Sequence, residues 1–402
     1  SLIITGNPVP QLGFISNAAG EDVAMLEKLN GVVTDLGFQE YTQTDKSMFD
    51  VFAITGALMF GTAGLPHVII RFFTVPSAKA ARFSAGWALI FIAALYTTAP
   101  AVGAFARINF IDTVNEATYI QDGEDYEARA AEIEVAGGKP VPTWYKTWEK
   151  TGLLQYEDKN GDGIMQYRGP NTPDGIENEV NPNRDIFVLA NPQIAQLPAW
   201  VIGLVVAGGL AAALSTAAGL LMVISSAVSH DICRRTLFKD MDDKTELRVA
   251  RGAAAGAVVA AGLLGIYSAQ LGFVAQVVAF AFGLASASLF PVIFLGIFWK
   301  RMNKEGAIVT MLFGLISTFA YIVYFKFGGG TPEQFLFGVS PEGIGFVFMW
   351  ISGALGVVTA LATAPPPQDV QDLVEDIRVP GTRQPHGSAD AGMAPAAAVP
   401  AE

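Results

Sequence analysis

Seven long apolar stretches alternate with polar segments along the 402-residue chain. A helix that crosses the hydrocarbon core of a bilayer needs about 20 apolar residues. The stretches of about this length or longer lie at 48–70, 83–106, 197–228, 252–269, 273–299, 307–325 and 344–364. The third is too long to cross upright, so we expect it to tilt or to extend beyond the bilayer. The pattern predicts an all-α, polytopic helical membrane protein.

Lysine and arginine are concentrated in alternate connecting segments, which predicts the orientation of the chain. They are Arg71, Lys79, Arg82, Arg234, Arg235, Lys239, Lys244, Arg248, Arg251, Lys300, Arg301 and Lys304. By the positive-inside rule these segments are cytoplasmic, and so is the C-terminus. We therefore expect an extracytoplasmic segment (1–47), two spans (48–106), an extracytoplasmic loop (107–196), five spans (197–364) and a cytoplasmic tail (365–402). Its Pro-, Ala- and Gly-rich composition predicts that the tail is disordered.

The composition agrees with a membrane protein, because only 15% of the residues are charged against about 25% in soluble domains. The net charge of −12 comes with no basic stripe, so nucleic acid is excluded as a partner. The single cysteine, Cys233, excludes an internal disulfide. The chain begins at Ser1 without the features of a signal peptide, so we expect it to be part of a longer protein.

The first apolar stretch contains a helix-breaking motif, GTAGLPH, at residues 61–67. Pro66 has no amide hydrogen for the carbonyl of Thr62, and Gly61 and Gly64 weaken the helix further. Such a break survives in a membrane where it faces protein or water, and discontinuous helices hold substrates in many secondary transporters. The alternative interpretation is a simple proline kink.

The third stretch places two adjacent hydroxyls, Ser215 and Thr216, in an apolar run. Ser215 shares one helix face with Gly208, Ala212 and Gly219, and small residues on a face allow another helix to approach closely. The two hydroxyls and a nearby carbonyl offer three oxygens to a sodium ion, and another helix must supply the rest. The alternative is that the hydroxyls bond only to carbonyls one turn earlier.

Three segments resemble the sodium:solute symporter family, and most closely its cation/acetate symporter-like branch. They are GTAGLPHVIIRFFTVPSAKAAR, LAAALSTAAGLLMVISSAVSHDI and VIFLGIFWKRMNKEGA, in the family's order. The resemblance implies a fold of two inverted five-helix repeats with extra helices. The first five stretches are similar to the second repeat and the last two to the extra helices, so we expect the first repeat to be missing.

The resemblance also implies two sets of site residues. The sodium ligands are the carbonyl of Ala212 and the hydroxyls of Ser215 and Thr216, with further ligands from the missing first core helix. The residues that line the substrate cavity are Gly61, Thr62, Gly64, Pro66 and Gln276. The chain lacks the Tyr-Trp pair of the sugar-transporting members at the break, which favours a small solute over a hexose.

The long polar loop contains DKNGDGIMQY, which has the beginning of a calcium-binding pattern. Asp158, Asn160 and Asp162 are candidate calcium ligands at alternate positions, followed by the carbonyl of Ile164. Position twelve is Gly169 instead of a bidentate glutamate, so Asp174 or Glu177 would have to fold back. The alternative is a polar turn built from Asp, Asn and Gly.

These patterns predict a sodium-coupled symporter of a small organic solute, most simply a monocarboxylate such as acetate. We expect a multi-pass protein of the plasma (inner) membrane whose partners are sodium, the solute, the lipid bilayer and, as a further candidate, a small membrane subunit. The spans show no paired carboxylates, histidine cluster or nucleophile, so we expect no enzyme. A proton-coupled transporter and a symporter-like membrane sensor are the alternatives. A sensor needs a cytoplasmic catalytic module, and residues 365–402 show no such pattern.

Overall fold

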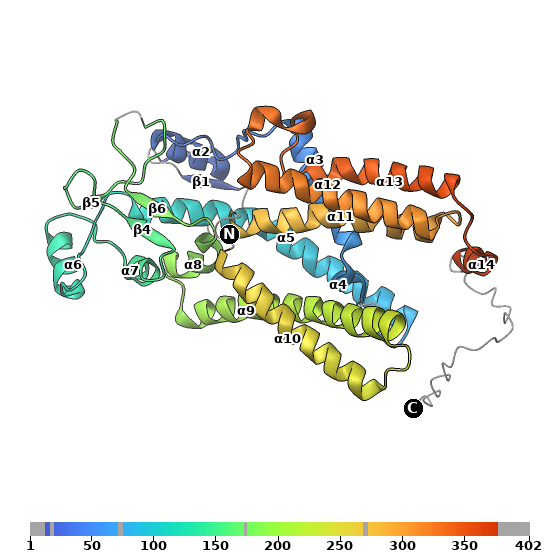
Figure 1. Ribbon diagram of the computed structural model, residues 1–402. Coiled ribbons are helices and arrows are strands. Elements are labelled where there is room, and N and C mark those ends of the chain that lie inside the picture. The colour runs from blue at the N-terminus through green and yellow to red at the C-terminus, as the bar shows by residue number, and fades with distance from the viewer. Residues whose placement is uncertain (1–12, 17–19, 71–74, 173–174, 268–271, 377–402) are drawn as a thin grey trace. The chain divides into compact units, whose positions relative to one another are not determined.

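The computed structural model describes residues 13–16, 20–70, 75–172, 175–267 and 272–376 (Figure 1). The chain forms two compact units. The first consists of Ser1–Met48 and Pro66–Val278, and the second of Phe49–Leu65 and Ala279–Glu402. Each unit is described below by itself.

Six helices in the described part of the chain are long and apolar enough to cross a membrane. They are α5 (Ala78–Val114), α9 (Ala199–Ser226, continued by the π-helix η3, Ala227–Leu237), α10 (Asp243–Tyr267), α11 (Val274–Phe298), α12 (Lys304–Phe327) and α13 (Ile344–Ala362). They coincide with six of the seven predicted spans. The remaining stretch forms the shorter helices α3 (Met48–Gly64) and α4 (Pro66–Ile69).

The break in the first stretch is confirmed at Leu65, which separates α3 from α4. Pro66 is the first residue of α4, a position where the missing amide hydrogen costs no helical hydrogen bond. The boundary between the two compact units also falls between Leu65 and Pro66. The local chemistry of the GTAGLPH motif therefore determines where the helix ends.

The helix α5 begins five residues before the predicted span of 83–106 and ends eight residues after it. Its 37 residues extend for about 55 Å, more than the hydrocarbon thickness of about 30 Å. The aromatic side chains of Phe83, Trp87 and Phe91 are exposed on its first half. Ala104, near the end of the predicted span, and Ile108, beyond it, are by contrast buried in the core of the domain that follows. The helix continues because its apolar spacing is maintained into that core.

The predicted extracytoplasmic loop is a folded domain with its own hydrophobic core. Its helices are α6 (Tyr126–Val135), α7 (Thr143–Glu149) and α8 (Ile186–Ile194), and α2 (Met25–Asp35) joins them. Its strands form antiparallel pairs, β3 (Ala117–Thr118) with β5 (Ile164–Met165) and β4 (Leu154–Tyr156) with β6 (Val180–Pro182). A further pair joins β1 (Phe14–Ser16) and β2 (Asp22–Ala24). The fold is thus helical in the membrane, and the all-α prediction omitted these short strands.

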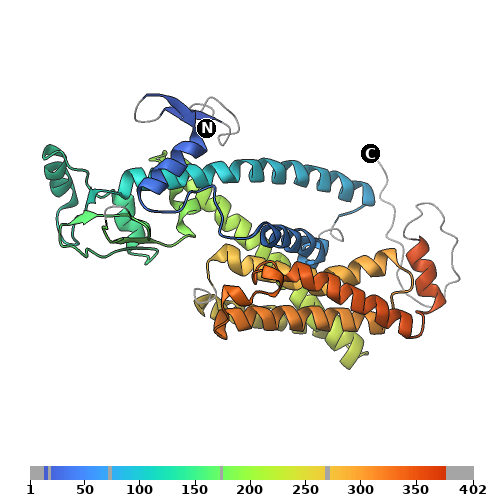
Figure 2. The ribbon, with the colours of Figure 1, turned by 90° about the horizontal axis from the view of Figure 1, so that it is seen from above.

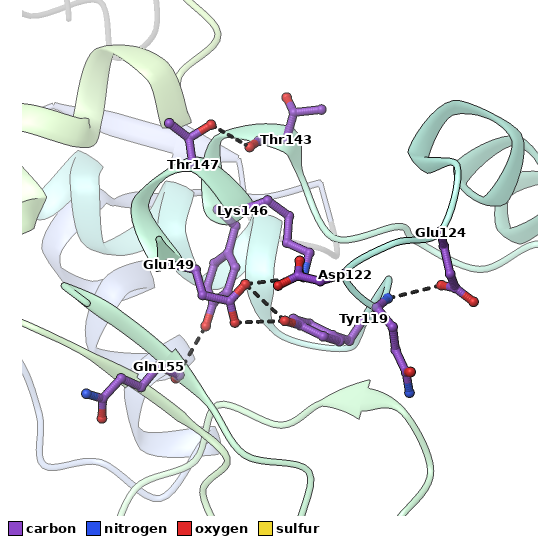
Figure 3. A network of polar contacts seen from close by, with 10 residues as sticks. Tyr119, Asp122, Glu124, Thr143, Lys146, Thr147, Glu149 and Gln155 are labelled. Atoms are coloured by element: carbon purple, nitrogen blue, oxygen red, sulfur yellow. Dashed lines mark hydrogen bonds and ion pairs between the residues drawn. The ribbon is translucent and has the colours of Figure 1, made fainter. Parts of the chain in front are cut away.

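A network of hydrogen bonds and ion pairs links side chains of this domain (Figure 3). The Tyr119 hydroxyl donates to the two carboxylate oxygens of Glu149 at 2.8 and 3.0 Å. Lys146 Nζ lies 3.1 Å from Asp122 Oδ1 and 3.2 Å from Glu149 Oε2, and it sits 3.8 Å from the centre of the Tyr119 ring. Burial raises the pKa of the Tyr119 hydroxyl, so it stays protonated and able to donate. The network ties α7 to the segment that follows β3.

Small residues hold the second unit together, where α3, α11, α12 and α13 pack closely. A Cβ added to Gly61 would overlap the carbonyl of Phe282, and one added to Gly314 would overlap that of Ala287. The Ser352 hydroxyl donates to the same Ala287 carbonyl at 2.6 Å. Close backbone approach and interhelical hydrogen bonds replace hydrophobic collapse as the source of cohesion in lipid.

The sequence predicted a disordered tail over residues 365–402. Part of this tail is instead helical, as α14 (Gln368–Asp376). The Gln371 side chain donates to the Pro366 carbonyl at 2.8 Å, and Glu375 pairs with Lys300. These contacts hold a segment whose composition alone indicated disorder. Residues 377–402 lie outside the described residues.

We predict that Gly314→Ala destabilises the second unit by about 1–3 kcal/mol, because the added methyl overlaps the Ala287 carbonyl. Gly296→Ala is the matched control, since it lies in α11 with nothing within 4 Å of its would-be Cβ. It should be neutral or stabilising by up to about 1 kcal/mol. Denaturant unfolding of the purified chain in detergent measures both. Equal stabilities for the two variants would contradict the packing described for α11 and α12.

Candidate functional site

The predicted sodium ligands lie near the middle of α9 in the first unit. Thr216 Oγ1 donates to the Ala212 carbonyl at a distance of 3.1 Å, which is the back-bonding that the alternative interpretation expects. The same contact places the two oxygens side by side. A cation of the size of Ca²⁺ binds oxygens at about 2.3–2.6 Å, so two oxygens 3.1 Å apart can contact one ion. Ser215 precedes Thr216 on the same helix turn.

The face of α9 that carries these groups is open in the first unit. Gly208, Ala212, Ser215 and Thr216 are all exposed, and α9 contributes no buried residue among those described. Three oxygens from one helix are fewer than the six or more that a hard cation such as Ca²⁺ takes in proteins. These three oxygens alone therefore cannot complete a cation site, and the assignment of sodium ligands to α9 stays a prediction that requires oxygens from a second element.

The residues assigned to the substrate cavity have different surroundings. Gly61 and Gly64 are buried against α11, since Cβ atoms there would meet the carbonyls of Phe282 and Ala285. Thr62 is exposed and its hydroxyl donates to the Leu58 carbonyl at 2.8 Å. Close helix packing is therefore a sufficient reason for the two glycines. Their role in a cavity remains a prediction.

Pro66 and Gln276 belong to the first unit. Pro66 is exposed at the start of α4, and Gln276 is half-buried in the first turn of α11. Gly61, Thr62 and Gly64 belong to the second unit, so the five residues of the predicted cavity are divided between the units.

The candidate calcium loop brings together three carboxylates, two of which the sequence predicted. Oxygens of Asp158, Asp162 and Glu179 lie within 4.8 Å of one another. Glu179 was missed, because the sequence suggested Asp174 or Glu177 instead. Glu177 pairs with Lys159 at 3.3 Å, and Asp174 lies outside the described residues.

The register of β4 and β6 explains why Glu179 reaches the loop. Tyr156 pairs with Val180 in this antiparallel ladder, and the Glu157 amide donates to the Glu179 carbonyl at 3.0 Å. Glu179 is therefore placed beside the residues that follow β4. Its side chain is 1% exposed and accepts the amide hydrogen of Lys159 at 2.9 Å.

The loop is folded by its own hydrogen bonds, as the polar-turn alternative expects. Asp158 accepts the amide hydrogens of Gly161 and Gly163 at 2.6 and 3.0 Å. Asp162 accepts that of Ile164 at 2.7 Å and a side-chain hydrogen of Asn160 at 2.9 Å. The Ile164 amide is the largest cause that lowers the pKa of the Asp162 carboxyl, which therefore stays ionised to unusually low pH.

The sequence comparisons agree with the order of these elements. The profile described as "Sodium:solute symporter family" matches residues 1–125 and 175–314. This match includes α3, α9 and α11 and leaves out residues 126–174, which hold α6, α7 and the candidate calcium loop.

Two curated relatives are transporters by name. A protein of Cupriavidus necator, named as an uncharacterized symporter, is 35% identical over 240 residues, which are 59% of this chain and 31% of that protein. The monocarboxylic acid transporter of Corynebacterium glutamicum is 49% identical over 57 residues, 14% of this chain and 10% of that protein. The matched segments thus span about a third and a tenth of these relatives. Because the profile covers most of this multi-pass chain, the chain belongs to the sodium:solute symporter family.

Proposed function

We propose that the protein containing this chain is a sodium-coupled symporter of a small monocarboxylate, with acetate as the first candidate. The observation that carries the proposal is the pair of oxygens on α9, from Ala212 and Thr216, beside the Ser215 hydroxyl. Family membership supports sodium as the coupling ion. The short but close match to a protein named as a monocarboxylic acid transporter supports the solute class. Coupling to protons, or a role as a membrane sensor, is the competing function.

The sodium ion has to lose its water before it binds, so a complete set of oxygens must replace that water. In our proposal α9 gives three, from Ala212, Ser215 and Thr216, and a helix outside this chain gives the others. The small face formed by Gly208, Ala212, Ser215 and Gly219 suits this role, because it lets a second helix backbone approach closely. Sodium then joins the two helices only when both are in place.

The residues that we propose for solute binding lie at the break between α3 and α4 and in the first turn of α11. Backbone groups freed at Leu65 can bind a polar solute, as in other transporters with discontinuous helices. Gln276 offers an amide from α11. Gly61 and Thr62 present no aromatic ring for a sugar, so we propose that the solute is small. We also propose that the protein lies in the plasma (inner) membrane with its C-terminus in the cytoplasm, because the positively charged connecting segments favour this orientation.

We predict that Ser215→Ala and Thr216→Ala each raise the sodium concentration for half-maximal acetate uptake about tenfold, the effect of losing about 1.4 kcal/mol of ion binding. Uptake is measured in proteoliposomes that hold the whole transporter, at equal protein level. Ser225→Ala is the matched control, because its hydroxyl also lies on α9 and donates to the Met222 carbonyl at 3.0 Å. Unchanged sodium dependence in both variants would mean that the hydroxyls only back-bond.

We also propose that the folded loop takes up a calcium ion between Asp158, Asp162 and Glu179. The three carboxylates within 4.8 Å of one another support this, since carboxylate oxygens are the ligands that Ca²⁺ prefers. The loop already folds without an ion, so calcium adds stability to a formed turn. Ile164 then acts through its amide, which holds Asp162 in place, and Asn160 through its side chain.

We predict calcium-dependent heat when the 402-residue chain in detergent is titrated with CaCl₂, with a dissociation constant of about 10⁻⁴–10⁻³ M, as for extracellular modules. Asp162→Ala should abolish it, whereas Asp122→Ala, an exposed aspartate of the same domain, should not. The lowered pKa of Asp162 keeps binding intact in weak acid. Binding is then lost as the pH falls through that depressed value. Absence of heat at neutral pH would leave the polar turn as the whole explanation.

A further inference from the structure

Asp185 occupies the N-cap position of one helix but gives its carboxylate to another. It precedes α8, yet in the described part of the chain its side chain makes no cap bond to that helix. Instead its two carboxylate oxygens each accept the amide hydrogen of Val274, at 3.2 Å. Val274 is the first residue of α11 and lies 89 positions further along the chain. Asp185 therefore caps a membrane helix from the extracytoplasmic domain.

Asn183 accepts two amide hydrogens at the start of α8. Its side-chain oxygen accepts the Asp185 amide hydrogen at 2.9 Å, and its carbonyl accepts that of Ile186 at 3.2 Å. The turn before α8 is thus satisfied without the Asp185 carboxylate. An aspartate that would normally cap its own helix is in this way free to face α11.

The start of α11 needs such a cap. The first amides of a helix have no partner within the helix, and a negative group there is favoured by the helix dipole. The Phe273 carbonyl accepts the amides of Gln276 and Val277, so Phe273 closes the first turn. Gly272 before it has φ +120°, a conformation that other residues rarely adopt. The Asp185 carboxylate is the group that satisfies the Val274 amide at this sharp entry.

A second contact comes from the neighbouring residue. The Arg184 guanidinium lies 5.6 Å from the centre of the Phe273 ring, which is within the range of a cation–π interaction. A cavity of about 650 Å³ lies at the N-terminal end of α11, and its wall includes Arg184, Asp185, Phe273 and Val274. Gln276 lies two residues beyond Val274, in the same helical turn.

The helix that follows Asp185 is firmly held. Ile186, Ala190 and Ile194 of α8 are at most 3% exposed in the core of the extracytoplasmic domain, the same core that contains the end of α5. The Gln193 side chain accepts the indole hydrogen of Trp148 at 2.5 Å. The helices α5 and α9 both lie against α8. A cap that stands on α8 therefore holds the first turn of α11, which belongs to the same unit as α8 and α9.

We propose that Asp185 is a positioning residue for transport. It holds the extracytoplasmic end of α11, and with it Gln276, at a set place beside α8, so that the solute side of the pathway keeps its register with α9. This inference rests on the proposed symport function for its consequence, but the cap itself is a property of the chain. The two parts are separable by experiment.

Hydrogen exchange on the 402-residue chain in detergent tests the cap without any transport. Asp185→Ala should speed exchange of the amides of residues 274–277 by about five- to tenfold, the effect of losing a helix cap. Asp185→Asn should restore slow exchange to within about twofold, because asparagine caps about as well as aspartate. Asp122→Ala is the control, since its ion pair with Lys146 lies in the same domain and leaves α11 untouched. Unchanged exchange at 274–277 in Asp185→Ala would overturn the proposal.

Uptake by the whole transporter tests the positioning role. Asp185→Ala should raise the acetate concentration for half-maximal uptake about five- to tenfold, in proportion to the lost cap. The sodium concentration for half-maximal uptake should stay within about twofold, and Asp185→Asn should rescue the acetate value. A general folding defect would lower the maximal rate with both half-saturation values unchanged, and this result would overturn the positioning role. Absence of uptake by the unmodified transporter would refute the symport function and leave the exchange result standing.

Discussion

The structure depends on one constraint, that every backbone amide and carbonyl inside hydrocarbon must find a partner within the protein. The six long apolar helices in the described part of the chain satisfy this constraint, because a helix pairs its backbone groups internally. At the interruption at Leu65 and at the entry to α11 at Gly272, the regular helical hydrogen-bond pattern is broken. Pro66 starts a new helix, where its missing amide hydrogen costs no hydrogen bond. The Asp185 carboxylate accepts the amide hydrogen of Val274 at the start of α11. The functional residues that we assign lie close to these places or on α9.

Because lipid and side chains are equally apolar, the helices of the second unit are held by shape and not by exclusion of water. Gly61 and Gly314 let backbones approach until a methyl group no longer fits, and Gly356 makes room for the Thr310 hydroxyl. The buried Asp50 adds a polar link, since it accepts both the amide and the hydroxyl hydrogen of Ser340 at 2.9 and 2.8 Å. The first unit has a different basis, because its domain between α5 and α9 buries aromatic and aliphatic side chains as a water-soluble protein does.

Local chemistry made the membrane helices and their break predictable from the sequence. Apolar runs of fixed length have one solution in a bilayer, and Pro66 has the same effect in any surroundings. The missed features all depend on contacts between distant residues. Glu179 reaches the candidate calcium loop through strand register, α5 extends because a core receives its end, and Asp185 serves a helix 89 positions away. The sequence next to Glu179, to the end of α5 and to Asp185 gives no sign of these distant partners.

Because α5 is one continuous helix, a movement of one of its ends is transmitted to the other. Figure 2 shows α5 as one continuous helix. Its first half carries exposed aromatic rings, and its last residues, Ile111 and Val114 among them, are packed into the core of the domain that follows it. Over a rod of about 55 Å, a tilt of about 5° moves the far end by about 5 Å. Since that end cannot leave its core without exposing apolar surface, the whole domain has to travel with it. A rearrangement of the first half of α5 is thereby transmitted to the domain that receives its other end.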